Sequence, residues 1–240
     1  MPEEINRLVT DALSRWLLTP SEDADANLMA EGAHPDRIVC VGNIMADSLF
    51  RAVERSAPSN VLERLGVTRP YVLATLHRAS LVDDRTRLGD VLSTLGDLPS
   101  DCDVVYPVHP RTRSNITRFG ITVSPRIRMI EPLGYLDFVH TEANAQVVFT
   151  DSGGVQEETT MLGIPCVTIR ENTERPITVS EGTNVVVGFS RDRILSAAEA
   201  ALSGSREPRR PPMWDGQTAR RVVDVLLSER ALTPVPEHDR

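Results

Sequence analysis

The stretch from Ala145 to Gly163 carries the residues with the clearest chemical potential. It contains a short apolar run, the turn sequence DSGG at 151–154, and then a helical pattern. Asp151 and Ser152 can cap the helix, and the two glycines let the backbone approach a ligand. The first amides of a helix have no internal partner, and the peptide dipoles place about half a positive charge there. The turn is therefore a natural phosphate cradle, and the implied ligand is an anion.

Two neighbouring glutamates, Glu157 and Glu158, follow in the first turns of this helix. Successive helix residues point about 100° apart, so at most one of them faces a ligand over the turn. A carboxylate would repel a phosphate, but it suits a ribose, whose two hydroxyls can both donate to it. This pattern favours a nucleotide. The alternative for this stretch alone is a Ser-Gly-Gly turn that serves only close packing in a parallel sheet.

The elements around this stretch alternate as in a doubly wound sheet. Most of the apolar runs after residue 70 are separated by helical patterns, and runs this apolar are typical of strands buried on both faces. The sequence therefore predicts a Rossmann-like α/β domain with a parallel sheet. The expected strands cover 71–77, 103–109, 126–130, 145–150, 165–169 and 184–188.

The first 55 residues resemble the tail of a domain rather than a whole one. They contain a helix from Pro2, a strand near 16–18, a helix capped by Ser21, a strand at 37–41 and a further helix. Residues 56–60 are the best linker candidate, and a proline-rich break precedes the last helical pattern. We expect three parts: 1–55 as the end of a truncated N-terminal Rossmann-like domain, 56–205 as a ligand-binding domain, and 206–240 as a helix with a loose tail.

Basic side chains follow several of the predicted strands. In an open α/β sheet, ligands bind beyond the carboxyl ends of the strands. His77 and Arg78 follow the strand at 71–77, His109 follows the next one, and Arg170 and Arg175 follow the strand at 165–169. One histidine alone is more often structural than catalytic. With the loop 131–134 and the DSGG turn, however, five strand ends agree, which favours a common site. His34, His140 and His238 are interpreted as structural, whereas the Arg175 guanidinium can hold two phosphate oxygens.

Composition excludes several classes of partner. The chain has 240 residues and a formal charge of −8, which argues against nucleic acid. Three widely spaced cysteines, Cys40, Cys102 and Cys166, have no metal-ligand spacing and predict buried free thiols in a reducing compartment. The charged start and the absence of an apolar run of about 20 residues predict no membrane contact and a cytoplasmic location.

Seven motifs, specific as a set, occur in order over nearly the whole chain. They resemble the non-hydrolysing UDP-N-acetylglucosamine 2-epimerases, whose fold is of the glycosyltransferase-B type. The resemblance implies two Rossmann-like domains facing a cleft, of which this chain supplies the C-terminal half that holds most of the nucleotide. The motifs are PEEINR (2–7), TLHRAS (75–80), PVHP (107–110), PLGYLDF (132–138), TDSGGVQEE (150–158), LGIPCVTIRENTERP (162–176) and EGTNVVVG (181–188).

The same resemblance implies a role for individual residues. Ser152, Gly153 and Gly154 would bind the diphosphate with help from the basic side chains, Glu158 would accept the ribose hydroxyls, and the uracil would lie against Phe138. Glu3 and His77 are the implied catalytic residues. The implied binding residues are Arg7, His77, Arg78, His109, Leu133 through its backbone, Phe138, Ser152, Gly153, Gly154, Glu158 and Arg175.

The implied reaction is the interconversion of UDP-N-acetylglucosamine and UDP-N-acetylmannosamine. UDP is eliminated as a proton leaves C2, and UDP adds back after a proton arrives on the other face. No metal and no redox cofactor is implied. The alternative is a remnant or partner subunit that binds UDP or a UDP-sugar without catalysis, and a glycosyltransferase would need an acceptor site to which nothing in the sequence points.

The chain departs from the family pattern at its start. In the family, a complete N-terminal domain with two further acidic residues at the sugar precedes the segment that matches PEEINR. We expect either a miscalled start, a split gene or a catalytically silent remnant, with the first two favoured. The expected partner is a second copy of the chain or a complementing N-terminal half, and the opening helices are expected to expose apolar faces.

Overall fold

A computed structural model describes residues 2–68, 70–98, 102–204 and 209–228, except for the side chain of Glu3. The chain forms two compact units, Met1–Phe50 with Pro211–Arg240 and Arg51–Arg210. In this division the segment after residue 210 belongs with the first fifty residues. The domain boundaries expected from the sequence stay a prediction.

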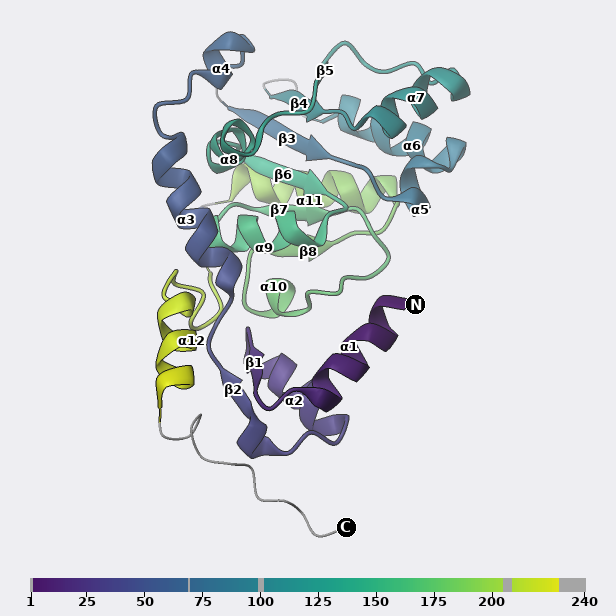
Figure 1. The fold of residues 1–240 in the computed structure, drawn as a ribbon. Helices are drawn as coiled ribbons and strands as arrows, with labels where there is room; N and C mark the ends of the chain where they lie inside the picture. The colour runs from purple at the N-terminus through teal and green to yellow at the C-terminus, as the bar shows by residue number, and fades with distance from the viewer. Residues whose placement is uncertain (1, 69, 99–101, 205–208, 229–240) are drawn as a thin grey trace. The chain divides into compact units, whose positions relative to one another are not determined.

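The larger unit is built on one parallel sheet of six strands (Figure 1). Counted along the chain, the strand order is that of a doubly wound sheet, in which two halves are wound outward from the middle. This confirms the predicted Rossmann-like α/β fold. In spatial order the strands are β5 (Ile127–Ile130), β4 (Asp103–Pro107), β3 (Tyr71–Thr75), β6 (Val147–Thr150), β7 (Cys166–Thr168) and β8 (Asn184–Val186).

Helices cover both faces of this sheet (Figure 1). One apolar core lies under α5 (Ala79–Val82), α6 (Arg85–Gly96), α7 (Pro110–Phe119) and α11 (Arg191–Ser203). A smaller core lies on the other face, under α4 (Val61–Arg64), α8 (Tyr135–Ala143) and α9 (Gly153–Leu162), with α10 (Ile177–Ser180) beside α9.

The strand residues alternate between these two cores. Val72 and Ala74 of β3 point into the larger core, whereas Tyr71 and Leu73 point into the smaller one. All four are fully buried. Because successive strand residues face opposite sides, a strand covered on both faces must be apolar throughout, which explains the runs that identify the sheet in the sequence.

The smaller unit contains a two-stranded parallel sheet, β1 with β2, and α12. The indole N–H of Trp214, which is buried, donates to the carbonyl of Pro20 at 3.0 Å. The carboxylate of Asp47 accepts the amides of Thr218 and Ala219 at 3.1 and 2.9 Å, so it satisfies the start of α12. The elements are α1 (Pro2–Leu13), β1 (Leu17–Thr19), α2 (Glu22–Ala30), η1 (Pro35–Arg37), β2 (Ile38–Cys40), α3 (Ile44–Ser56, which runs into the larger unit) and α12 (Thr218–Leu227).

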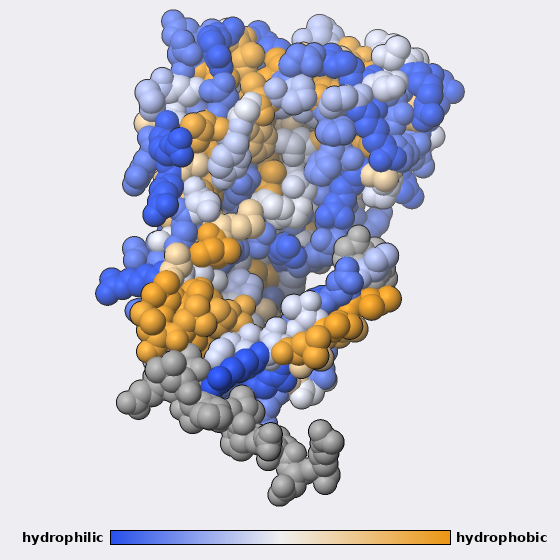
Figure 2. Space-filling view, in the orientation of Figure 1, coloured by the Kyte–Doolittle hydropathy of each residue, from blue (hydrophilic) through white to orange (hydrophobic). Residues whose placement is uncertain are grey.

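One side of α1 is apolar and exposed, as expected from the sequence. Ile5 is 63% and Leu13 83% exposed, and Figure 2 shows hydrophobic residues gathered along this helix. Among the described residues, no helix is both long and apolar enough to cross a membrane.

Three local expectations were incomplete or wrong. Ser21 lies at the start of α2, but its hydroxyl donates to Asp23 instead of capping the helix. Cys102 and Cys166 are buried and form no disulfide, as predicted, whereas Cys40 is partly exposed. The helices α10 and α11 were not among the predicted elements.

Candidate functional site

The candidate site lies where the sheet changes its direction of winding. β3 and β6 are neighbours at the centre of the sheet, and the connections leave them toward opposite edges, which opens a crevice at their carboxyl ends. His77 and Arg78 follow β3, and the turn 151–154 follows β6. The structure thus brings together the first basic pair and the glycine turn, as expected.

Asp151 joins these two segments. Its side chain is buried, and its carboxylate accepts the backbone amide of His77 at 2.9 and 3.1 Å and that of Arg78 at 2.8 Å. The imidazole Nδ1 of His77 lies 3.0 Å from Oδ1 of the same carboxylate. The prediction that Asp151 caps α9 is therefore wrong, because these donors occupy its carboxylate.

The Asp151 carboxylate also sets the charge of His77. Its hydrogen bond to the ring raises the pKa of His77, and its negative charge adds to this effect, while partial burial and Arg78 oppose it. The imidazolium form is therefore favoured more than in an isolated histidine. Because Nδ1 faces Asp151, Nε2 is the ring nitrogen left to donate to an anion.

The turn itself presents backbone donors. Ser152 begins α9, and its Oγ accepts the amide of Val155 at 3.5 Å. Within the described residues, the amides of Gly153 and Gly154 donate to no protein acceptor. A Cβ atom built on Gly153 would meet no atom within 4 Å, so the space over the turn is not filled by packed side chains and suits an anion.

Arg175 pairs with the first of the two glutamates that follow the turn. Its Nε lies 3.2 Å from Oε2 of Glu157, without the angles of a hydrogen bond. The Glu157 side chain is 8% exposed and that of Arg175 43%, so the carboxylate is buried and the guanidinium reaches the surface. Sequence reasoning assigned no role to Glu157. The adjacent Glu158 was the pattern that could have revealed this role, since two neighbouring glutamates on a helix must point in different directions.

Glu174 connects the other two arginines of the site. Its carboxylate lies 2.8 Å from Nη2 of Arg170 and 3.4 Å from Nη1 of Arg78. The hydrogen bond from Arg170 lowers the pKa of Glu174, and the charge of Arg78 adds to this effect. Arg78 also donates its Nε to the carbonyl of Asp151 at 3.1 Å. The two arginines therefore share one acidic partner at the edge of the site.

The second glutamate, Glu158, is nearly buried on the same helix. Burial raises the pKa of Glu158 to about 7, and the charge of Glu157 adds to this effect, while a hydrogen bond from Tyr135 opposes it. Phe138 and Leu133 are partly buried on α8 and in the loop before it. Tyr135, which sequence reasoning did not single out, is the exposed neighbour of Glu158.

Two other predicted residues have partners of their own in the described structure. His109 begins α7, and its Nδ1 accepts the amide of Arg111 at 3.2 Å. Arg7 belongs to the smaller unit, where it forms ion pairs of 2.7, 2.8 and 2.7 Å with Glu4, Asp11 and Glu31. The Glu3 side chain lies outside the described part of the chain.

The remaining histidines fit their structural interpretation where they are described. Nδ1 of His140 lies 2.9 Å from the carbonyl oxygen of Ser56, and exposed His34 begins the short helix at Pro35–Arg37. His238 falls outside the described residues. Within the described ranges, no cluster of histidine, cysteine and acidic side chains could hold a metal ion.

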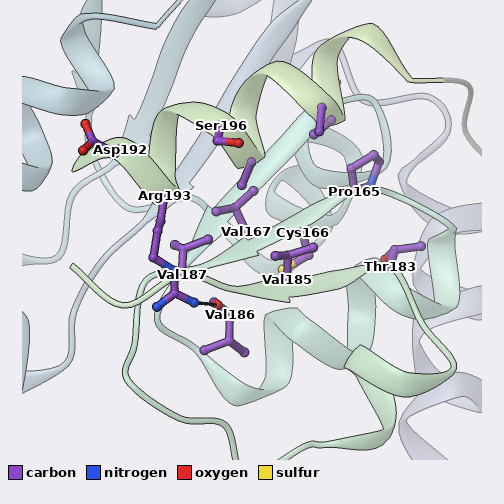
Figure 3. A pocket seen from close by; sticks show the side chains of 13 residues that line it. Pro165, Cys166, Val167, Thr183, Val185, Val186, Val187, Asp192, Arg193 and Ser196 are labelled. Carbon is purple, nitrogen blue, oxygen red and sulfur yellow. Dashed lines mark hydrogen bonds between the residues drawn. The ribbon is translucent and has the colours of Figure 1, made fainter. Parts of the chain in front are cut away.

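A separate cavity of about 600 Å³ lies between the strands β7 and β8 and the helix α11 (Figure 3). Its lining is mostly valine and alanine. Arg193 reaches over it and donates to the carbonyl of Val186 at 2.8 Å, which covers part of the open edge of β8. None of the residues of the turn or its basic neighbours lines this cavity, so it is not part of the site.

The doubly wound sheet, with a glycine-led helix and basic side chains at its switch point, defines the chain as a Rossmann-like α/β protein. A family model described as UDP-N-acetylglucosamine 2-epimerase matches residues 1–227. The chain belongs to this family, which confirms the resemblance noted in the motifs.

Individual relatives agree with this assignment. The UDP-N-acetylglucosamine 2-epimerase of Methanocaldococcus jannaschii is 37% identical over 94% of this chain and 64% of its own length. The UDP-2,3-diacetamido-2,3-dideoxy-D-glucuronate 2-epimerase of Pseudomonas aeruginosa is 39% identical over 94% of this chain and 63% of its own length. The chain thus spans less than two thirds of the length of these relatives.

Solved structures show the same fold. The M. jannaschii UDP-GlcNAc 2-epimerase in complex with UDP-GlcNAc and UDP superposes with a TM-score of 0.83 at 38% identity, over 94% of this chain and 64% of the other. The Neisseria meningitidis enzyme bound to UDP-GlcNAc superposes with a TM-score of 0.80 at 27% identity, over 94% and 65%. The larger unit therefore has the α/β architecture of a glycosyltransferase-B type epimerase.

Proposed function

We propose that this chain supplies the UDP-binding half of a UDP-N-acetylglucosamine 2-epimerase, which interconverts UDP-N-acetylglucosamine and UDP-N-acetylmannosamine. The observation that carries the proposal is the junction of His77, Asp151 and the glycine turn at the switch point of the sheet. A pyrophosphate is an anion, so it needs hydrogen-bond donors that carry positive charge. The proposed site offers it a helix start, an imidazole with a raised pKa and a guanidinium.

The same groups suit the departure of UDP. As the bond from the anomeric carbon to the phosphate oxygen breaks, negative charge grows on the diphosphate, and preformed donors lower the barrier by stabilising it. In the proposal, the amides of Gly153 and Gly154, protonated His77 and Arg175 supply these donors. Arg78 adds charge at the edge of the site.

Glu158 is proposed to bind the ribose. Its carboxylate lies on the same helix as the anion turn, one turn further along. Phe138 and the backbone of Leu133 would hold the uracil. The acid-base groups at C2 include Glu3 in this proposal, with Arg7 and His109 as further binding residues, and each positioned proton donor or acceptor contributes about 10²- to 10⁴-fold in rate.

The sugar is the part of the substrate that the larger unit specifies least. The P. aeruginosa relative is named for a different UDP-sugar, although its reaction is also a 2-epimerisation. Incubating the chain separately with UDP-N-acetylglucosamine and with UDP-2,3-diacetamido-2,3-dideoxy-D-glucuronate shows which of the two sugars it epimerises. The alternative function is binding of UDP or a UDP-sugar without catalysis.

Deuterium incorporation tests the proposal directly. In D₂O, removal and return of the C2 proton places deuterium at C2 of both epimers, which proton NMR detects. UDP binding, measured by calorimetry, should weaken by about 10- to 100-fold in Arg175→Ala, because a charged hydrogen-bonding partner is lost. Unchanged affinity in this variant would contradict the assigned site, and UDP binding without deuterium incorporation would favour the binding alternative.

The exposed apolar side of α1 supports a covering partner, because contiguous apolar patches on a surface mark interaction sites. The proposed partner is a second copy of the chain or a complementing N-terminal half. Sedimentation of the chain alone distinguishes the first from the second. Location in the cytoplasm stays a prediction from the sequence.

A further inference from the structure

Gln156 lies at the centre of a buried polar network behind the anion turn. Its side chain is fully buried on α9, between the two segments that are proposed to hold the diphosphate. Its Nε2 donates to the carbonyl of Ser152 at 3.0 Å. Its Oε1 accepts the hydroxyl of Thr173 at 2.6 Å and the Nδ2 of Asn184 at 3.1 Å. One amide therefore contacts the turn, the loop that carries Arg175, and β8.

The first branch from Gln156 reaches the backbone N–H of Arg175. This amide donates to Oγ1 of Thr173 at 2.9 Å. A hydroxyl oxygen that accepts this bond can still donate its own proton, and Thr173 donates it to Gln156. The hydrogen bonds therefore run in one direction, from Arg175 through Thr173 and Gln156 to Ser152.

A second branch reaches the carbonyl of the same arginine. Asn184 Nδ2 donates both to Gln156 and to Oγ1 of Thr178, the latter at 3.0 Å. The Thr178 hydroxyl then donates to the carbonyl of Arg175 at 2.7 Å. Asn184 and Thr178 are both buried. Both backbone polar groups of Arg175 are thus tied to one glutamine.

The chemistry of this network suits a glutamine at 156. An amide donates and accepts at once, whereas an ionised glutamate only accepts and a methionine makes neither bond strongly. Buried networks whose members are all satisfied rigidify their surroundings, and partly satisfied ones are costly. The network therefore gives the Arg175 loop one position relative to the turn.

We propose that Gln156 and Thr173 are positioning residues, whose directed hydrogen bonds hold Arg175 at the distance from the anion turn that a pyrophosphate bridges. This inference rests on the proposed function, because it assigns the network to UDP binding. The supporting side chains act through Arg175 and touch no ligand themselves. Such support is what keeps a binding group within a fraction of an ångström of its working position.

Thr173→Val is the decisive variant, since Thr173 is only partly buried and valine keeps its branched shape while removing the hydroxyl that donates and accepts. We expect UDP affinity to fall by about 3- to 10-fold, as for one lost hydrogen bond, and uridine affinity to stay unchanged because uridine lacks the diphosphate. Thr173→Ser keeps the hydroxyl and should bind UDP like the wild type. Thr117→Val, on the exposed side of α7, is the matched control.

Two further variants separate positioning from folding. In the Arg175→Ala background, Thr173→Val should cost no additional UDP affinity, because its effect passes through Arg175. Gln156→Glu keeps the side-chain volume, but an ionised glutamate cannot donate to the carbonyl of Ser152. This variant should lower the affinity for UDP more than the affinity for uridine. Wild-type UDP affinity in Thr173→Val, or equal losses for UDP and uridine, would overturn the inference. Failure of the wild-type chain to bind UDP would instead overturn the proposed function.

Discussion

The Nδ1 atom of His77 lies 3.0 Å from Oδ1 of Asp151, across the junction of the two central strands. The two residues are 74 positions apart in the chain. The same carboxylate also accepts the backbone amides of His77 and Arg78. One buried acid thus fixes where the loop after β3 lies and which nitrogen of the imidazole faces the site.

Asp151→Asn should lower the pKa of His77, because the hydrogen bond and the charge that raise it are both weakened. Affinity for UDP-N-acetylglucosamine should fall as the pH rises through the pKa of His77, and this fall should begin at a lower pH in the variant. NMR of the ring protons gives the pKa, and calorimetry gives the affinity.

The same variant should lose about 2 kcal/mol of unfolding free energy, since a charged acceptor of buried amides is replaced by a neutral one. Asp83→Asn is the control, because the exposed Asp83 side chain pairs with Arg111 instead of His77. An unchanged pKa of His77 in a folded Asp151→Asn chain would refute the assigned relationship.

Gly153→Ala should separate stability from binding. The added Cβ meets no atom within 4 Å, and alanine in a helix is favoured over glycine by about 0.5 to 1 kcal/mol. The same methyl group projects into the space where a diphosphate would approach, so UDP affinity should fall by about tenfold or more. Chemical denaturation and calorimetry measure the two effects.

Gly182→Ala provides the contrasting control. There a Cβ would lie 2.4 Å from the carbonyl of Thr178 and 2.7 Å from the Thr160 side chain, and overpacking of this kind costs about 1 to 3 kcal/mol. If Gly153→Ala instead bound UDP as tightly as the wild type, the diphosphate would not lie over this turn.

Glu157→Gln should weaken UDP binding indirectly. The change removes the ion pair that holds Arg175, so the guanidinium becomes less well placed, and the loss should be about 3- to 10-fold, smaller than in Arg175→Ala. The double variant should bind UDP like Arg175→Ala alone. Additive losses in this double-mutant cycle would show that Glu157 acts by a separate route.

Glu142→Met should change how stability depends on pH. Glu142 is fully buried on α8, and its carboxylate oxygens have no hydrogen-bond partner among the described residues. Burial, with the charge of Glu158 second, raises the pKa of Glu142 well above the usual value. The folded state therefore binds more protons than the unfolded state above the ordinary pKa of a glutamate. The stability that Glu142 contributes is full below that pKa and is lost as the pH rises toward its folded pKa, by up to about 1.4 kcal/mol per pH unit.

Urea unfolding at several pH values tests whether the stability contributed by Glu142 falls as the pH rises. The stability difference between Glu142→Met and the wild type should grow with pH, in favour of methionine. Glu199→Met, on the exposed side of α11, should give a constant difference. Parallel curves for Glu142→Met and the wild type would mean that Glu142 ionises normally in the folded chain.

Local patterns were sufficient to predict the sheet and the position of the glycine turn. The strands β3 to β8 follow from apolar runs, because a strand covered on both faces has no polar side to interrupt it. His77, Arg78 and the turn were placed at one edge because the carboxyl ends of parallel strands coincide. The same reasoning missed α11, whose short apolar pattern is masked by alanine and charged residues.

Only the tertiary structure decided which side chains act together. The local pattern allowed Asp151 to cap α9, but the backbone amides of His77 and Arg78, in the segment after β3, occupy its carboxylate. It left Gln156 and Thr173 without a role, although a hydrogen bond joins their side chains. Sequence by itself determined the strands of the sheet and the family, since these depend on local periodicity and motif order. Folding decided the partners, because a buried hydrogen bond joins groups that only packing brings within 3 Å.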